Sequence, residues 1–228
     1  MTADFFRFPH TPHLAWLGEC SPRDDKVLSD AEAKSFVSAP VVVEEKLDGA
    51  NLGVSLAPDG AVRAQNRGQY LVTPYTGQFS RLNAWMAQHQ AALREALDQH
   101  LILFGEWCAA RHSVAYGALP DWFLLFDVYD RAERRFWSAQ RRDELAARLG
   151  LCVVARRFAG RTNLANLQTL LATTPSAYGS DVLEGVVIRR DGMDWSEARA
   201  KLVRADFTQA IGEHWQRRAI EWNRQLAK

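Results

Sequence analysis

Cysteine is scarce in this chain, and long apolar runs are missing. The 228 residues contain three cysteines, Cys20, Cys108 and Cys152, which lie too far apart for a zinc site or a disulfide framework. No run reaches the roughly 18 apolar residues of a membrane-spanning helix. The N-terminus, MTADFFRFPHTPHLAW, lacks the basic segment and apolar stretch of a signal peptide. We therefore expect a soluble cytoplasmic protein that does not act in a membrane.

An excess of charge of one sign is also missing. The chain has 28 Lys and Arg against 27 Asp and Glu, a formal net charge of +1. This balance excludes a protein coated in basic residues but is compatible with a local basic groove. Apolar residues make up 47% and charged residues 24%, which is ordinary for a globular protein of this size. Because there is no internal repeat or low-complexity linker, we expect a single domain over residues 1–228.

The hydrophobic periodicity predicts strands interleaved with helices after a loop-rich, proline-punctuated segment at residues 1–40. Runs with strand character are Val41–Glu45, Leu52–Leu56, Val62–Gln65, Leu101–Trp107, Trp122–Tyr129, Cys152–Phe158, Gly185–Arg190 and Ala200–Val203. Helical patterns cover Ser29–Phe36, Phe79–Gln99, Ser138–Leu149 and Asn163–Ala172. In residues 208–228, apolar positions from Ile211 to Leu226 recur at intervals of three or four, which predicts a C-terminal helix. This order favours an α+β fold with antiparallel sheets.

Lys46 stands where a lysine needs an explanation. The segment Val41 to Val54 reads VVVEEKLDGANLGV, so three β-branched residues precede the lysine and an Asp48-Gly49 turn follows it. A lysine at the end of a buried strand is costly unless it is paired or used chemically. With an ordinary pKa near ~10.4 it is protonated at neutral pH. Burial, neighbouring cations or a metal must lower that pKa before the amine can attack phosphorus. The alternative is a surface lysine before a hairpin.

Further charged and aromatic residues follow in a recognisable order on predicted strands. Glu106 lies in LFGEW, Glu184 in LEGVVIR and Lys201 in AKLVR. Between them, Arg67 lies in QNRGQYL and Phe126 in FLLFDV. Each short pattern alone also fits an ordinary solvent-facing or packing residue. Their joint occurrence in one order is the informative observation.

Taken in order, these patterns resemble motifs I (KxDGxN), Ia, III, IIIa, IV and V of the covalent nucleotidyltransferases. That superfamily contains ATP-dependent DNA ligases, RNA ligases and mRNA capping enzymes. Asn51, where DNA ligases usually carry arginine, and Glu45 before the lysine resemble the RNA ligase 2-like branch. The stretch GEWCAARHSVAYGALPDWFLLFDVYD also looks like bacterial RNA ligase-like proteins. The resemblance covers about Val41 to Phe207 and implies an antiparallel-sheet, ATP-grasp-like ligase adenylation domain with flanking helices.

The resemblance implies an ATP-dependent RNA ligase that uses ATP and Mg²⁺ (or Mn²⁺) in RNA repair. Lys46 would attack the α-phosphate of ATP to form lysyl-AMP, AMP would pass to an RNA 5′-phosphate, and a 3′-hydroxyl would displace it. Lys201 would neutralise charge on the α-phosphate, and Asp48 and Glu184 are the candidate metal ligands. The other nucleotide-binding candidates are Glu106 and Arg67 at the ribose, Phe126 and Glu45 at adenine, Asn51, Glu184 and Arg189.

Two departures from the family pattern affect these expectations. Motif V often reads Lys-x-Lys, but the second position here is Val203, and Arg204 beside it points to the opposite face of a strand. Only 21 residues follow Phe207, too few for an OB-fold or another C-terminal domain. We therefore expect a minimal ligase that acts on RNA ends, with a partner protein as a possible source of RNA grip.

Other functions fit parts of the sequence. The chain could be a non-sealing module that binds RNA ends, a small DNA ligase or a GTP-using capping-type enzyme. Asn51 and Glu45 favour the RNA ligase over the last two. His10, His13 and His112 lack the spacing of a metal site and are interpreted as surface or hydrogen-bonded residues.

Overall fold

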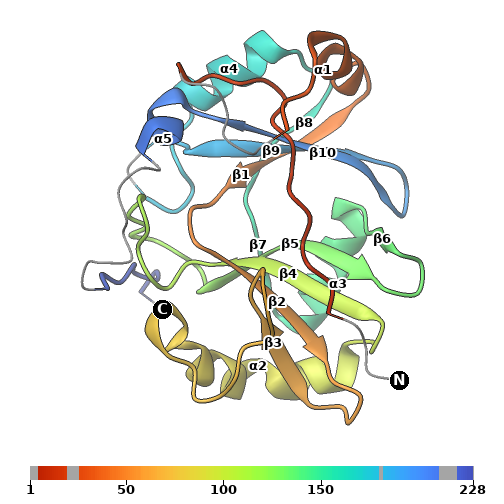
Figure 1. Cartoon of the computed structure of the whole chain (residues 1–228), viewed down its shortest axis with the longest axis vertical. Coiled ribbons are helices and arrows are strands. Elements are labelled where there is room, and N and C mark those ends of the chain that lie inside the picture. Colours follow the sequence, from red (N-terminus) through yellow and green to blue (C-terminus); the bar gives the residue numbers. More distant parts are fainter. Residues whose placement is uncertain (1–4, 20–25, 180–181, 211–219, 228) are drawn as a thin grey trace.

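The computed structural model describes residues 5–19, 26–179, 182–210 and 220–227. Two sheets lie face to face, and helices cover the outer face of each (Figure 1). Within the described residues, no helix is long and apolar enough to cross a membrane. The expected α+β architecture with antiparallel sheets and flanking helices is confirmed.

The first sheet, here called the β1 sheet, has four antiparallel strands in the order β10-β9-β1-β8. They are β1 (Val41–Lys46), β8 (Arg156–Gly160), β9 (Gly185–Asp191) and β10 (Ser196–Val203). Helices α1 (Asp30–Phe36) and α4 (Leu164–Thr173) lie on its outer side (Figure 1). The core between them contains Val41, Val43, Leu167, Leu171, Val186 and Ile188.

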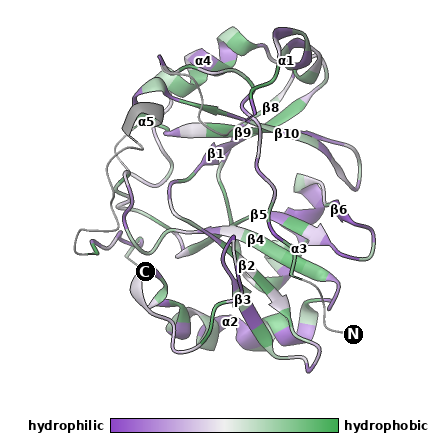
Figure 2. Ribbon diagram, in the orientation of Figure 1, coloured by the Kyte–Doolittle hydropathy of each residue, from purple (hydrophilic) through white to green (hydrophobic). Residues whose placement is uncertain are grey.

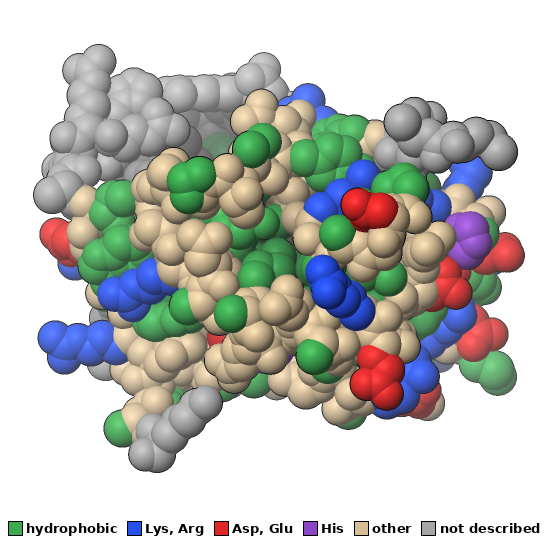
Figure 3. All heavy atoms as spheres, turned by 90° about the horizontal axis from the view of Figure 1, so that it is seen from below, with side chains coloured by type: hydrophobic (Ala, Val, Ile, Leu, Met, Phe, Trp, Pro, Cys, Tyr) green, Lys and Arg blue, Asp and Glu red, His purple; other side chains and the backbone are tan. Residues whose placement is uncertain are grey.

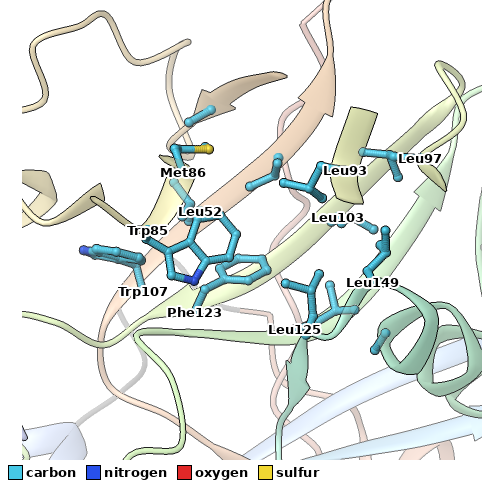
Figure 4. Close-up of a cluster of buried hydrophobic side chains, with 14 of the residues drawn as sticks. Leu52, Trp85, Met86, Leu93, Leu97, Leu103, Trp107, Phe123, Leu125 and Leu149 are labelled. Carbon is cyan, nitrogen blue, oxygen red and sulfur yellow. The ribbon is translucent and has the colours of Figure 1, made fainter. Parts of the chain in front are cut away.

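The second sheet, the β5 sheet, has the order β3-β2-β4-β5-β6, with β7 paired in parallel to β5. Its strands are β2 (Ala50–Leu56), β3 (Val62–Gln65), β4 (Leu101–Trp107), β5 (Phe123–Asp130), β6 (Arg135–Phe136) and β7 (Cys152–Val153). Helices α2 (Leu82–Ala96) and α3 (Ala139–Leu149) pack on it. Leucine side chains from both layers and the rings of Trp85, Trp107 and Phe123 form the core between them (Figure 4).

Local sequence signals account for most helix boundaries. Ser29 and Glu32 form the expected capping box at α1, and Ser138 and Asn163 cap α3 and α4 through their side chains. The predicted Phe79–Gln99 helix is too long at both ends. Gly77–Phe79 forms a separate 3₁₀ turn (η1) before it, and α2 ends at Ala96, where Leu97 is extended. Colouring by hydropathy shows polar and apolar residues alternating along α3, whereas β4 is mainly apolar (Figure 2).

One strand prediction was wrong and one short strand was missed, for reasons that only tertiary structure explains. The predicted strand Cys152–Phe158 divides into β7 and β8, which belong to different sheets. The short strand β6 was not predicted. Similarly, β1 and β2 do not form a hairpin, because the chain passes between the two sheets at Leu47–Gly49. This crossing places the end of β1 in the space between the sheets.

The predicted C-terminal helix over 208–228 is confirmed at 208–210 and wrong at 220–227. Helix α5 (Ala205–Ala210) ends within it, and Ile211, Trp215 and Ala219 lie outside the described residues. Residues 220–227 are extended, with isolated bridges at Trp222 and Gln225. Asn223 is buried there against backbone groups of residues 108–116. These long-range hydrogen bonds override the helical spacing of the apolar residues.

The face that carries α2 shows positive, negative and apolar side chains interspersed (Figure 3). This agrees with the small net charge of the chain. The concentration of charge that matters for function lies instead between the two sheets.

Candidate active site

A cavity of about 740 Å³ lies between the β1 and β5 sheets. Both sheets and the N-terminal segment contribute to its wall. Its lining includes Phe8, His10, Thr11, Glu44, Glu45, Lys46, Asn51, Arg67, Glu106, Phe126, Asp127, Arg189, Arg199 and Lys201. The structure therefore brings most of the predicted site residues, which are scattered from residue 45 to residue 201, around one space.

Lys46 reaches this cavity because of how β1 ends. Val41 and Val43 are buried in the core of the β1 sheet, and Lys46 is the last residue of the strand, paired with Gly185 of β9. The chain then passes close to β4 at Gly49, where a Cβ atom would lie 2.6 Å from the carbonyl oxygen of Trp107. Glycine is required by this close approach. The Gly49 amide also donates to Glu106 Oε1 at 3.0 Å.

Glu184 pairs with the lysine. Its Oε1 atom lies 2.6 Å from Lys46 Nζ, and the carboxylate is 9% exposed. Burial lowers the pKa of Lys46, but the charges of Glu184, Glu106 and Asp48 outweigh it and raise that pKa above its ordinary value. This is the opposite of the depressed pKa that a nucleophilic amine requires. In this state the structure stabilises an ammonium ion that is oriented but not yet reactive.

Glu106 has a strongly perturbed carboxyl group. Burial raises its pKa to about 7, Lys46 opposes this shift, and the negative charges of Asp48 and Glu184 reinforce it. Burial likewise raises the pKa of Glu184, which Lys46 and Lys201 lower in part. Three carboxyl groups therefore surround one lysine, and they disfavour one another's ionisation. A cation, or a phosphate-bearing ligand that binds together with a metal ion, would relieve this excess of carboxyl groups over amines.

Asp48 is held by a loop that follows β4. Its Oδ2 atom accepts hydrogen bonds from the amides of Ser113 at 2.6 Å and Val114 at 3.1 Å. Its own amide donates to the hydroxyl of Tyr116 at 2.8 Å, and the imidazole Nδ1 of His112 lies 4.0 Å from Oδ1. Burial lowers the pKa of His112, against the pull of Asp48. The orientation of Asp48 is thus determined by residues 65 to 68 positions later in the chain.

The remaining predicted residues form the other walls. Lys201 lies on β10, two strands from β1, and its charge reaches Glu184. Asn51 pairs with Glu106 across β2 and β4, and its Oδ1 atom is buried with no hydrogen-bond partner among the described residues. Phe126 of β5 is half-buried, with the ring of Phe8 edge-on at 5.2 Å. An aromatic wall, two lysines and orphaned polar atoms are suited to a nucleotide.

The family is established by a sequence model. The model for RNA ligase matches residues 39–203, which is most of the chain. This chain belongs to the RNA ligase family. No curated protein matches it.

Solved RNA ligases share the fold of this family member. The Naegleria gruberi RNA ligase with PPi matches with a TM-score of 0.60 and 20% identity, over 82% of this chain and 55% of that one. A variant of that ligase with ATP and Mn gives 0.61 and 20%, over 78% and 54%. An archaeal ATP-dependent RNA ligase (form 2) gives 0.61 and 19%, over 88% and 49%. The chain spans about half the length of these ligases.

The carboxylates of this family member fit a hydrated divalent cation better than a closed metal centre. Among the described residues, no group of three or more His, Cys, Asp or Glu side chains is arranged to hold a metal ion. However, Glu184 Oε2 is buried and has no hydrogen-bond partner in the described structure. Mg²⁺ typically takes one or two carboxylates and completes its shell with water and substrate phosphates. Glu184 and Asp48 therefore remain suitable ligands.

Glu45 lines the cavity as predicted, but its carboxylate is bound to protein groups, and its neighbour Glu44 lines the cavity as well. The Glu45 carboxylate accepts from Ser176 and the Ala177 amide and pairs with Arg157, so reading adenine would require it to release these partners. Successive residues of a strand face opposite sides, which puts Glu44 on the side of Lys46. Glu44 lines the cavity and pairs with Arg142 at 2.6 Å. Strand alternation was the signal that could have found it.

Arg189 lines the cavity but is bound to protein groups. It is 1% exposed, pairs with Asp127 at 2.5 Å and Asp191 at 3.3 Å, and donates to two backbone carbonyls. Arg199, which the sequence analysis missed, also pairs with Asp127, and burial lowers its pKa to about 10. In this state Arg189 joins β9 to β5 behind Phe126, and its predicted contact with the nucleotide remains a prediction.

The structure also shows where the side chains that follow Lys201 in motif V lie. Val203 is buried, and the guanidinium of Arg204 pairs with Asp206 rather than lining the cavity. The other basic side chain that β10 contributes to the cavity wall is therefore Arg199, two residues before Lys201, rather than a residue after it. Phe8, His10 and Thr11, from the segment predicted only as loop, do line the cavity. No local pattern in residues 5–14 could have revealed this, since their position depends on packing between the sheets.

Proposed function

We propose that this chain is an ATP-dependent RNA ligase that works through a lysyl-AMP intermediate. The observation that carries the proposal is that Lys46, paired with Glu184 at 2.6 Å, lines one cavity together with Lys201, Glu106 and Phe126. Such a cavity presents an amine, cationic groups for phosphate and an aromatic ring for a base. The ligands found with the related RNA ligases, ATP, AMP, Mn and PPi, are those that this reaction would use or release.

In the first step, Lys46 would act as nucleophile. Its Nζ loses a proton and forms a bond to the α-phosphorus of ATP, while the bond from that phosphorus to the bridging oxygen breaks and pyrophosphate leaves. Lys201, facing the same cavity, would stabilise the negative charge that develops on the α-phosphate. Phe126 would hold the adenine by stacking, and Glu106 and Arg67 would contact the ribose hydroxyls.

Glu184 controls whether the amine can react. Its charge raises the pKa of Lys46 and so holds the amine protonated but correctly placed. A bound Mg²⁺ or Mn²⁺ would supply positive charge that opposes this protonation and neutralises the triphosphate. Glu184 and Asp48 are the groups that would hold it. The carboxylates that protect the resting lysine are thus the same groups that permit its activation.

The later steps follow from the same site. An oxygen of an RNA 5′-phosphate would attack the AMP phosphorus, which breaks the phosphorus–nitrogen bond and frees Lys46. The 3′-hydroxyl of a second RNA end would then attack the activated 5′-phosphorus and expel AMP. Asn51 and Arg67 also line a shallower groove beside the cavity, together with Asn66, Gln69 and Gln78. This groove is a reasonable path for an RNA strand.

Incubation with ATP labelled at the α-phosphate tests the first step. With Mg²⁺ present, label should become attached to the protein, and the intact mass should rise by one AMP group. Lys46→Ala should abolish this adduct. Lys34→Ala, which removes an exposed lysine from α1, is the matched control and should label normally. Unlabelled wild-type protein under these conditions would contradict the proposal.

Sealing is tested separately with nicked duplexes and loose ends. The proposal expects a 5′-phosphate RNA strand to be adenylated and joined, and equivalent DNA nicks to be joined more slowly. Adduct formation without any joining would instead favour a chain that needs a partner protein to grip the RNA. Tight binding to RNA ends without an adduct would favour a non-sealing end-binding module.

A further inference from the structure

The C-terminal clasp, defined here as residues 220–227, runs beside the support loop, residues 108–119. In Figure 1 these two segments lie next to one another at the edge of the β5 sheet, although more than a hundred residues separate them in sequence. Backbone hydrogen bonds of 2.8–3.0 Å join them at Arg111–Glu221, Ala109–Asn223, Tyr116–Arg224, Leu119–Arg224 and Leu119–Leu226. The clasp is thus attached along most of the support loop.

Asn223 makes the central contact of the clasp. It is 5% exposed, and its Nδ2 donates to the carbonyls of Cys108 at 2.8 Å and Ala110 at 3.3 Å. Its Oδ1 accepts from the Tyr116 amide at 2.9 Å. One buried amide side chain therefore ties both arms of the support loop together. Removal of that side chain would leave three buried backbone groups without these bonds, which is more damaging than loss of an exposed hydrogen bond.

The support loop in turn determines the position of Asp48. Between the two arms held by Asn223, the amides of Ser113 and Val114 bind the Asp48 carboxylate. The hydroxyl of Tyr116 accepts a hydrogen bond from the Asp48 amide. Asp48 is one of the three carboxylates whose charge acts on Lys46. A continuous series of hydrogen bonds therefore leads from the clasp to the turn that follows the candidate nucleophile.

We propose that the C-terminal clasp positions the adenylation site, and that Asn223 is the positioning residue through which it acts. Asn223 fixes the curvature of the support loop, and the loop presents two amides and a hydroxyl to Asp48. This inference rests on the proposed function, because it concerns the rate of lysyl-AMP formation. A displacement of about 1 Å in a reacting group can slow a reaction on the order of 10²-fold.

The test compares full-length wild type, Asn223→Ala and Gln225→Ala, whose exposed side chain lies on the same segment. Adduct formation is followed in single turnovers over a range of ATP concentrations. Asn223→Ala should slow adduct formation at saturating ATP by about 10- to 100-fold. The half-saturating ATP concentration should change much less, because Phe126 and Arg67 belong to the cavity lining, to which the described residues of the clasp do not contribute. Gln225→Ala should behave as wild type.

Tyr116→Phe provides a second, milder variant that removes only the hydroxyl facing Asp48 and leaves the buried ring. It should slow adduct formation several-fold, and the double variant with Asn223→Ala should be little slower than Asn223→Ala alone, because both act through the same loop. If the substitutions instead caused a general loss of folded protein, the two reductions in rate would add in the double variant, and the thermal unfolding midpoint would fall. If Asn223→Ala fails to fold, Tyr116→Phe alone carries the test.

The two proposals fail in different ways. If wild type forms the adduct and both Asn223→Ala and Tyr116→Phe form it at the same rate, the positioning role is wrong and the ligase function stands. If wild type forms no adduct, the ligase function is wrong, and the positioning role falls with it.

Discussion

Two groups of charged residues border the cavity, and their charge balance differs. The lysine cluster, Lys46 with Asp48, Glu106 and Glu184, sets three carboxyl groups around one amine. The arginine cluster consists of Arg142, Arg189, Arg199, Glu44, Asp127 and Asp191, three guanidinium groups and three carboxylates. In the arginine cluster every guanidinium has a carboxylate partner. In the lysine cluster, by contrast, three carboxyl groups act on one amine, and Glu184 is the one that lies 2.6 Å from it.

This difference separates structural from chemical roles. Buried ions are tolerated when they are paired and hydrogen-bonded, so the balanced arginine cluster can join β5, β9, β10 and α3 without further groups. In the lysine cluster, burial raises the pKa values of Glu106 and Glu184, and the surrounding carboxyl groups raise that of Lys46. Clustered perturbations of this kind are typical of functional sites. Each variant below tests whether the two clusters differ in this way.

Lys46→Arg should have the largest effect on activity. Arginine retains the positive charge beside Glu184 but is always protonated, so it cannot attack phosphorus. Adduct formation should fall at least about 10³-fold, on the order of what removal of a catalytic nucleophile costs. The thermal unfolding midpoint should remain close to that of wild type. If the thermal unfolding midpoint fell along with adduct formation, Lys46 would have a structural role like that of the arginines.

Arg189→Met should have the largest effect on stability. It leaves Asp127 and Asp191 buried with less compensation, which should cost about 3–5 kcal/mol of unfolding free energy. Urea unfolding at pH 7 measures this loss. Arg190→Ala, at the neighbouring exposed ion pair with Glu197, should cost less than about 1 kcal/mol. Similar losses of unfolding free energy in the two variants would mean that the buried arginine cluster stabilises the protein no more than the neighbouring ion pair does.

Glu106→Gln should stabilise the protein at alkaline pH while impairing nucleotide binding. The folded-state pKa of Glu106, about 7 against an ordinary 4.5, means that the folded protein binds this proton more tightly than the unfolded chain. The carboxyl group therefore favours folding below about pH 4.5, and this contribution is lost as pH rises through 7. At pH 8 the variant should be more stable by about 1–3 kcal/mol. A stability difference that does not depend on pH would contradict the assignment.

Among these variants, Glu184→Gln should have the smallest effect, and that effect should be specific to the pKa of Lys46. Loss of the main charge that raises the pKa of Lys46 should shift that pKa downward by about one unit or more, since opposite charges within contact typically contribute this much. The pH dependence of Lys46 acylation by a small amine-reactive reagent, read by mass spectrometry, measures the shift. Exposed Lys34 in the same sample serves as the internal control. An unchanged Lys46 midpoint would mean that Glu184 does not govern its protonation.

Local chemistry made much of this protein predictable. Apolar periodicity located most strands, and Ser29, Ser138 and Asn163 marked helix starts, because capping and side-chain alternation involve residues only a few positions apart. The motif order pointed to Lys46, Glu106, Glu184 and Lys201, and the structure brings them near one another because each lies on, or directly beside, a strand that the pattern identified. The predictions of one strand over Cys152–Phe158 and of a helix at the C-terminal end were wrong for the opposite reason. Their state is set by hydrogen bonds to distant segments.

The sequence by itself determined the family, the kinds of groups in the site and the strands that present them. Only the tertiary structure decided that Glu184 pairs with Lys46 and raises its pKa, that Arg189 is bound to Asp127, and that Asn223 reaches the loop behind Asp48. The physical reason is that strand periodicity and capping are local, whereas ionisation and hydrogen-bond pairing depend on every charge and dipole within a few ångströms, from whatever part of the chain they come.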